Sequence, residues 1–160
     1  MTRAWRLFAL ALLLAVLAGC ATPRRPDVPP GMQAWSGRLS LNMDGAQPFS
    51  AGFELKGTPA SGELTLLTPL GGTAGVLTWS PGSATLRSSR ETRQFASLEA
   101  LVTEVTGTPL PVAALFDWLE GRATEVPGWQ VDVSQVGQGR LRAQRTSPAP
   151  AADLRVAFEH

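Results

Sequence analysis

The sequence predicts an α+β protein in which an antiparallel sheet of about nine short strands packs against two amphipathic helices. Most of the chain from residue 35 onward alternates apolar and polar residues with a period of two, which is typical of half-buried strands. A region of helical periodicity, residues 97–121, interrupts this pattern. Strands, then helices, then strands again favour an antiparallel sheet with its helices on one face.

Six strand patterns precede the helices, and Gly, Pro and Ser separate them. In residues 35–43 the apolar Trp35, Leu39 and Leu41 alternate with polar residues. In residues 49–57 Phe53 and Leu55 share one face. The other four patterns are residues 62–69, 75–80, 83–89 and 92–97.

Two helices follow. Ser97 suits the N-cap of the first, and Gly107 suits the left-handed residue that ends it. The second helix lies within residues 110–121, with Pro111 at its first position and Gly121 after its end. Each helix has one apolar stripe, made of Leu98, Leu101, Val102 and Val105 in the first and Val112, Leu115, Phe116 and Leu119 in the second.

Three more strands are predicted at residues 128–135, 139–146 and 153–159. The apolar face of the sheet and the two helix stripes must cover each other. The helices then either pack flush on the sheet or form the roof of a cavity. Because protein interiors are usually close-packed, residue patterns alone favour the dry core.

The N-terminal residues 1–19 have the order of a secretory signal peptide: basic Arg3 and Arg6, an apolar run over 7–17, then small residues. The apolar run of eleven residues is too short to span a bilayer as a helix. Leu17 to Cys20 resembles a bacterial lipobox, which implies cleavage before Cys20 and acylation of that residue; a free thiol is the alternative. Residues 20–34 are then the lipidated cysteine and a flexible proline-rich tether, and residues 35–160 the folded domain.

Several classes of function lack their chemistry in this sequence. Without Arg3 and Arg6, the 14 basic residues fall to 12 against 13 acidic ones, so charge gives no case for nucleic acid. The sequence contains one histidine, His160, and one cysteine, Cys20. A His-based catalytic triad or a metal site with His or Cys ligands therefore lacks its usual residues. No phosphate-binding glycine motif is present. We therefore expect no enzyme, metal or cofactor.

Six arginines fall in two groups that merit attention. One interpretation is that these arginines contact phospholipid headgroups or the acidic rim of a carrier protein. Ordinary solvated positions on the sheet are the simpler explanation for each. The two groups are Arg87, Arg90, Arg93 and Arg140, Arg142, Arg145.

The connection at residues 68–75 places a leucine where most turns carry polar residues. Pro69 restricts this loop, and Gly71 permits unusual backbone angles. Leu70 is therefore expected either to protrude into solvent or to fold back onto the sheet as core.

Taken in order, the motifs resemble those of the LolB family of outer-membrane lipoprotein receptors. They follow the lipobox at Cys20 and cover nearly all of residues 35–134. They are WSGRLSL at 35–41, LTLLTPLGGTAGVL at 64–77, LPVAALFDWLEG at 110–121 and PGWQVDVSQ at 127–135. The segment between Gly121 and Trp129 is shorter than in many relatives, which raises the question of a lost strand pair and a more open cavity wall.

The resemblance implies an incomplete antiparallel β-barrel whose helices cover an apolar cavity for acyl chains. The protein would be a monomer, anchored by its lipid to the periplasmic face of the outer membrane of a Gram-negative bacterium. It would accept acylated lipoprotein cargo from the periplasmic carrier LolA and insert it into the phospholipid of the inner leaflet. A structural or assembly lipoprotein with a dry core and a protein-binding surface is the alternative.

The resemblance also implies roles for individual residues. Leu70, held by Pro69 and Gly71, corresponds to a protruding apolar residue used for membrane delivery. The candidate cavity lining comprises Trp35, Leu39, Leu41, Phe53, Leu55, Leu64, Leu66, Trp79, Leu115, Trp118 and Trp129.

Overall fold

The computed structural model describes residues 32–159; the predictions for residues 1–31, including the signal peptide and Cys20, lie outside them. These residues form a nine-stranded antiparallel sheet in the order β6-β5-β4-β3-β2-β1-β9-β8-β7. The strands are β1 (Gln33–Met43), β2 (Phe49–Gly57), β3 (Gly62–Leu67), β4 (Thr73–Ser80), β5 (Ser83–Ser88), β6 (Thr92–Phe95), β7 (Trp129–Asp132), β8 (Arg140–Arg145) and β9 (Ala152–Glu159). Two helices, α2 (Leu98–Thr106) and α3 (Val112–Leu119), and a short 3₁₀ turn, η1 (Val136–Gln138), complete the described part of the chain.

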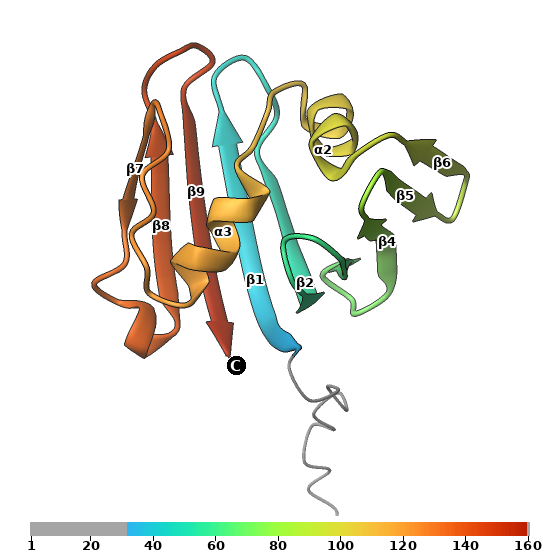
Figure 1. Cartoon of the computed structure of the whole chain (residues 1–160), viewed down its shortest axis with the longest axis horizontal. Helices are drawn as coiled ribbons and strands as arrows, with labels where there is room; N and C mark the ends of the chain where they lie inside the picture. Colours follow the sequence, from blue (N-terminus) through green and yellow to red (C-terminus); the bar gives the residue numbers. More distant parts are fainter. Residues whose placement is uncertain (1–31, 160) are drawn as a thin grey trace, which may run out of the picture.

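The sheet curves but does not close, so β6 and β7 form its two edges (Figure 1). Helix α3 lies across the concave face in front of β1 and β9, while α2 lies beside β2 on the side of β5 and β6 (Figure 1). The expected α+β class and incomplete barrel are thus confirmed. The C-terminal strand β9 pairs with β1 in the middle of the sheet, which joins the strands before the helices to those after them.

Side-chain alternation decides which residues face the helices. On β2, Ala51, Phe53 and Leu55 are buried, whereas Glu54 and Lys56 point to the outer face. The same alternation on β8 buries Leu141, Ala143 and Arg145 and exposes Arg140, Arg142 and Gln144. One slip of register would exchange the two sets, so the apolar face fixes the pairing.

The helix boundaries follow the expected signals closely. The Ser97 hydroxyl accepts a hydrogen bond of 3.1 Å from the Ala100 amide, as an N-cap should. Gly107 has a φ of 71° and its amide donates to the Thr103 carbonyl, which ends α2. Pro111 is one position earlier than expected: it flanks α3 with a non-helical ψ of 73°, and Val112 begins the helix.

The strand after the helices is shorter than its sequence pattern. Residues 128–135 alternate in character, but β7 ends at Asp132. The Asp132 carboxylate accepts hydrogen bonds from the amide and the hydroxyl of Ser134, which turns the chain toward η1. Local side-chain bonding therefore overrides the alternating pattern at this point.

Candidate functional site

An aromatic cluster joins α3 to the concave face of the sheet. Phe116 meets Trp35 edge to face, with ring centroids 5.7 Å apart, and meets Trp79 in the same way at 6.2 Å. The Trp79 indole also donates to the Thr58 carbonyl, which fixes its ring. Such edge-to-face pairs add to the burial of the rings themselves. Helix α3 is therefore firmly packed at its middle.

Trp118 holds the other side of α3. Its side chain is 1% exposed and its indole N–H donates to the Thr124 carbonyl at 2.8 Å. Its ring lies 6.1 Å from that of Trp129 on β7. The residues that follow α3 thus wrap around Trp118 and connect the helix to the edge of the sheet.

A small apolar cavity lies between the sheet and both helices. Its volume is about 50 Å³, and all thirteen residues that line it are apolar. Ligand pockets usually measure roughly 300–1,000 Å³. The cavity is much smaller, because the helices lie close against the sheet. Six of the expected lining residues surround this cavity: Leu39, Phe53, Leu55, Leu64, Trp79 and Leu115.

The other five expected residues lie elsewhere. Trp35, Leu66, Trp118 and Trp129 belong to the surrounding hydrophobic cluster but not to the cavity wall. Leu41 is buried outside that cluster. Seven further lining residues were not predicted, although their apolar periodicity was visible in the sequence; they come from β4, both helices and β9: Leu77, Leu98, Val102, Val112, Leu119, Leu154 and Val156.

A polar network holds the C-terminal end of α3. The Thr124 hydroxyl donates to the Asp117 carboxylate at 2.7 Å, and Arg122 forms ion pairs with both Asp117 and Glu120. The hydrogen bond from Thr124, followed by that from Arg122, holds the pKa of Asp117 below its usual value. The network therefore persists at neutral pH.

Arg145 corrects the expectation of an ordinary surface arginine, because its residue is only 4% exposed. Its guanidinium donates to the Pro109 and Pro150 carbonyls and to the Thr108 hydroxyl, the last at 2.8 Å. It also lies over the Trp129 ring, 5.5 Å from the centroid. Arg145 thus ties the α2–α3 connection to the β8–β9 loop, and within residues 32–159 its hydrogen-bond acceptors are neutral oxygens.

Leu70 protrudes at the tip of the β3–β4 loop with 99% of its surface exposed, so the alternative that it folds back as core is wrong. The Gly71 amide donates to the Thr68 carbonyl at 2.9 Å, which closes a turn with Pro69 at its second position. Gly71 has a φ of 83°, where a side chain would be strained. The loop is built to hold its apolar tip in water.

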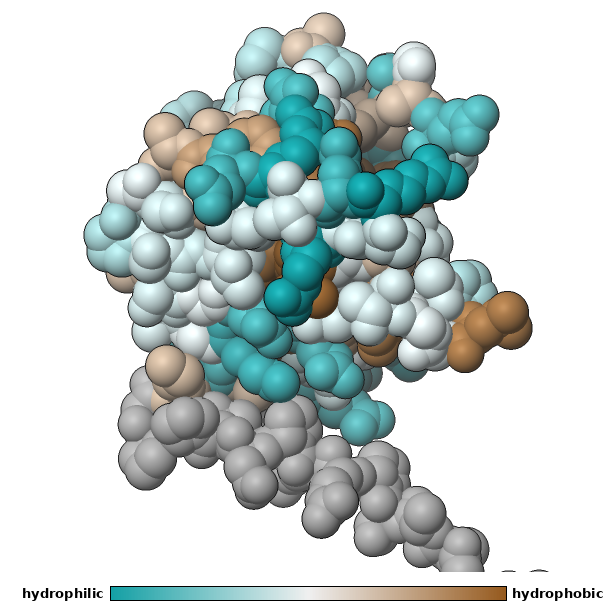
Figure 2. Space-filling view, turned by 90° about the vertical axis from the view of Figure 1, so that its right-hand side faces the viewer, coloured by the Kyte–Doolittle hydropathy of each residue, from teal (hydrophilic) through white to brown (hydrophobic). Residues whose placement is uncertain are grey.

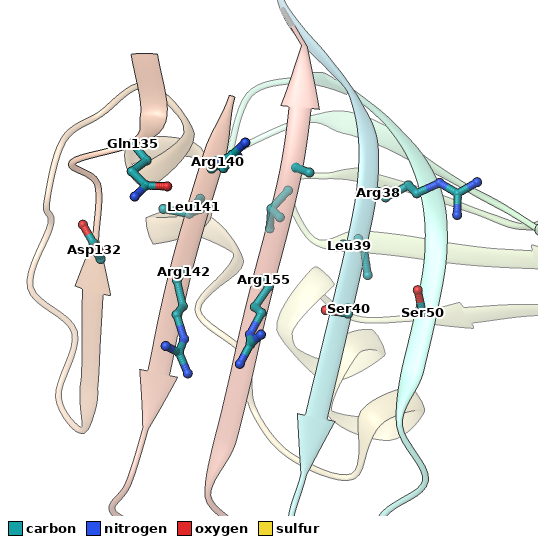
Figure 3. A pocket seen from close by; sticks show the side chains of 12 residues that line it. Arg38, Leu39, Ser40, Ser50, Asp132, Gln135, Arg140, Leu141, Arg142 and Arg155 are labelled. Atoms are coloured by element: carbon teal, nitrogen blue, oxygen red, sulfur yellow. The ribbon is translucent and has the colours of Figure 1, made fainter. Parts of the chain in front are cut away.

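The outer face of the sheet carries arginines around a shallow depression of about 510 Å³ (Figure 3). Arg142 and Arg155, on neighbouring strands, both bind the Asp153 carboxylate. These bonds, with that from Arg142 as the largest cause, lower the pKa of Asp153. Arg38 and Arg140 also line the depression. This face is polar and lies on the opposite side of the sheet from the apolar cavity.

Residues 33–150 match the family model described as "Outer membrane lipoprotein LolB". The chain belongs to the LolB family. A Bordetella petrii protein named outer-membrane lipoprotein LolB is 34% identical, with 96% of this chain and 93% of the relative aligned. Relatives of the same name from Bordetella parapertussis and Chromobacterium violaceum are 38% and 34% identical over 72% and 76% of this chain, and the matches cover 61% and 69% of their own lengths.

The LolB match runs from β1 to the β8–β9 loop and ends before β9. Neither the family description nor these names describes an enzyme. Within residues 32–159, no three His, Cys, Asp or Glu side chains gather closely enough to hold a metal ion. Over the same residues, neither helix has the length and apolarity needed to cross a membrane.

Proposed function

We infer that the protein is an outer-membrane lipoprotein receptor that accepts acylated lipoproteins from the carrier LolA and inserts them into the inner leaflet of the outer membrane. The cavity between the sheet and the helices carries this proposal, because every residue that lines it is apolar. Its relatives' names agree with an outer-membrane location. The receptor acts as a lipid-anchored monomer on the periplasmic face, with phospholipid as its second partner and no nucleic acid or cofactor.

Uptake of an acyl chain requires the closed cavity to widen, and the two helices differ in how firmly they are held. Helix α3 is held by the aromatic cluster and the bond from Trp118 to Thr124. Helix α2 also packs on the core, through buried Leu98, Leu101 and Val102, but it contains no aromatic residue. Its ion pair to the sheet, between Arg93 and Glu104, joins two exposed side chains. Exposed ion pairs contribute little to stability. We therefore assign the larger movement to α2.

A structural lipoprotein with a dry core is the second candidate, and the small volume of the cavity favours it. Native mass spectrometry distinguishes the two. The chain from residue 20 with Cys20→Ser is mixed with a triacylated peptide, and the receptor forms a one-to-one complex. A non-acylated peptide of the same sequence is the control. Absence of the acylated complex would refute the lipid-binding function.

Leu70→Glu is expected to separate acceptance of cargo from its delivery. The side chain touches no part of the cavity wall, so cargo should still pass from the carrier to the receptor. Loss of a buried leucine weakens membrane contact by about 1.5–3 kcal/mol, or roughly tenfold to a hundredfold. A labelled lipoprotein followed by pull-down and then by liposome flotation measures the two steps, with Leu70→Ile as the control that keeps the apolar area. Flotation equal to wild type for the glutamate variant would reject the membrane role.

Cys20→Ser is expected to yield an exported protein without lipid. A diacylglyceryl group and an acyl chain hold stably to a membrane, whereas one chain alone binds only marginally. Labelled palmitate followed by membrane fractionation measures the loss of the anchor. Incorporation of palmitate into the serine variant would show that Cys20 is not the modified residue.

A further inference from the structure

The exposed arginines of the described residues divide into two sets. Arg93, Arg122, Arg142 and Arg155 each form an ion pair with a carboxylate. The structure records no carboxylate partner within residues 32–159 for a second set, which is also exposed: Arg38, Arg87, Arg90 and Arg140. The second set is therefore available to bind an anion from outside the protein.

Sheet register places Arg38 beside the base of the loop that carries Leu70. Arg38 lies opposite Gly52, and Gly52 lies opposite Leu67, the last residue of β3. Two strand spacings, about 10 Å, separate Arg38 from Leu67. Gly52 has no side chain, and the side chain of Leu67 packs over it on the outer face.

Arg87 and Arg90 lie on the other side of the same loop. Arg87 is opposite Val76 near the start of β4, and it points to the outer face because Leu86 packs inward. Arg90 is in the β5–β6 turn, where its amide donates to the Ser88 hydroxyl. That turn and Ala74 of β4 border a shallow depression of about 600 Å³. The loop of Leu70 thus has arginines on both sides.

Two acidic residues lie near this surface, and the three arginines outnumber them. Glu54 is two residues from Gly52 on the same face, and Glu91 follows Arg90. Neither has an ion pair among the described residues. Figure 2, which faces the side with β4, β5 and β6, shows a strongly hydrophobic projection at the margin of the molecule; residues of intermediate hydropathy adjoin it, and strongly hydrophilic ones lie farther along the same face. An apolar tip with cations beside it matches the boundary between acyl chains and headgroups.

We propose that Arg38, Arg87 and Arg90 form a phospholipid-headgroup contact around Leu70, which we call the headgroup surface. Leu70 enters the acyl region while the three guanidinium groups bind lipid phosphates in the plane of the headgroups. Arginine suits this role because its planar donors match phosphate oxygens. The contact fixes the orientation of the domain on the membrane, which a single leucine on a loop does not. The inference rests on the proposed membrane delivery.

The test measures how the chain from residue 20 with Cys20→Ser, free of cargo, floats with vesicles of phosphatidylcholine with and without phosphatidylglycerol. Each of Arg38→Gln, Arg87→Gln and Arg90→Gln should lower partition onto the anionic vesicles about fivefold, the effect of one basic residue near such a surface. Glu54→Gln should raise it. Arg90→Lys should restore most of the binding, because the positive charge remains.

Lys56→Gln is the matched control, since Lys56 is a cation on the outer face of β2 but four residues beyond Gly52. It should change partition little. If Lys56→Gln and the three arginine variants lost equal amounts of partition, binding would depend on net charge and not on the headgroup surface, and the proposal would be overturned. The proposal would also be overturned if the protein with the three arginines intact showed no detectable partition onto anionic vesicles. The proposed function is judged separately, by acyl-peptide binding in solution, which the arginine variants should retain.

Discussion

Trp118→Glu is expected to unfold the protein or to leave it too unstable to bind an acyl chain. The side chain is 1% exposed, and its indole N–H satisfies the Thr124 carbonyl. Removing a buried tryptophan costs about 3–5 kcal/mol, and an unpaired carboxylate in its place costs several more or must bind a proton. Urea denaturation followed by circular dichroism measures the loss.

Trp118→Phe separates the contribution of the indole hydrogen bond from that of the ring. It keeps an aromatic ring in the contact with Trp129 but leaves the Thr124 carbonyl without its donor. We expect a loss of about 1–3 kcal/mol, as for other unsatisfied buried groups. Wild-type stability and fluorescent-lipid binding in Trp118→Glu would show instead that α3 does not cover the sheet through this residue.

The strands and helices could be predicted from sequence because their signals are local. Period-two alternation located all nine strands, and the Ser97 and Gly107 signals located the ends of α2. The prediction for β7 failed because a side chain bonds to its own turn: the Asp132 carboxylate accepts from Ser134 and ends the strand early. The prediction for α3 missed by one position, since Pro111 precedes the helix with a non-helical ψ instead of entering it.

The candidate site was harder to predict, because its parts come from distant segments. The alternation on β8 puts Arg145 on the same face as Leu141 and Ala143, yet charge alone suggested a solvated residue. Its partners lie far from it along the chain or across a loop, and the period of a strand or helix cannot predict such contacts; they are Thr108, Pro109 and Pro150. The volume of the cavity is likewise a tertiary property, since it depends on how closely two helices sit on a sheet.

Arg145→Met should destabilise the protein by about 2–4 kcal/mol, since hydrogen bonds to a charged group contribute about 1.5–3 kcal/mol each and do not add fully. Methionine fills much of the same space, but it leaves the Pro109 and Pro150 carbonyls and the Thr108 hydroxyl without their donors. The stability of Arg145→Lys should lie between those of the wild type and Arg145→Met, because an ammonium group cannot reproduce the planar guanidinium that bonds to two loops.

Arg142→Met is the matched control for this effect, because Arg142 lies on the same strand with its side chain in solvent and one carboxylate partner, Asp153. Exposed pairs of this kind contribute less than about 1 kcal/mol. Urea denaturation gives the two stabilities, and hydrogen exchange shows where the change acts. In Arg145→Met, protection should fall first in residues 107–111, which join α2 to α3. If both variants lost stability equally and exchange rose evenly over the sheet, Arg145 would be a general packing residue and the anchor of α3 would have to lie in the aromatic cluster alone.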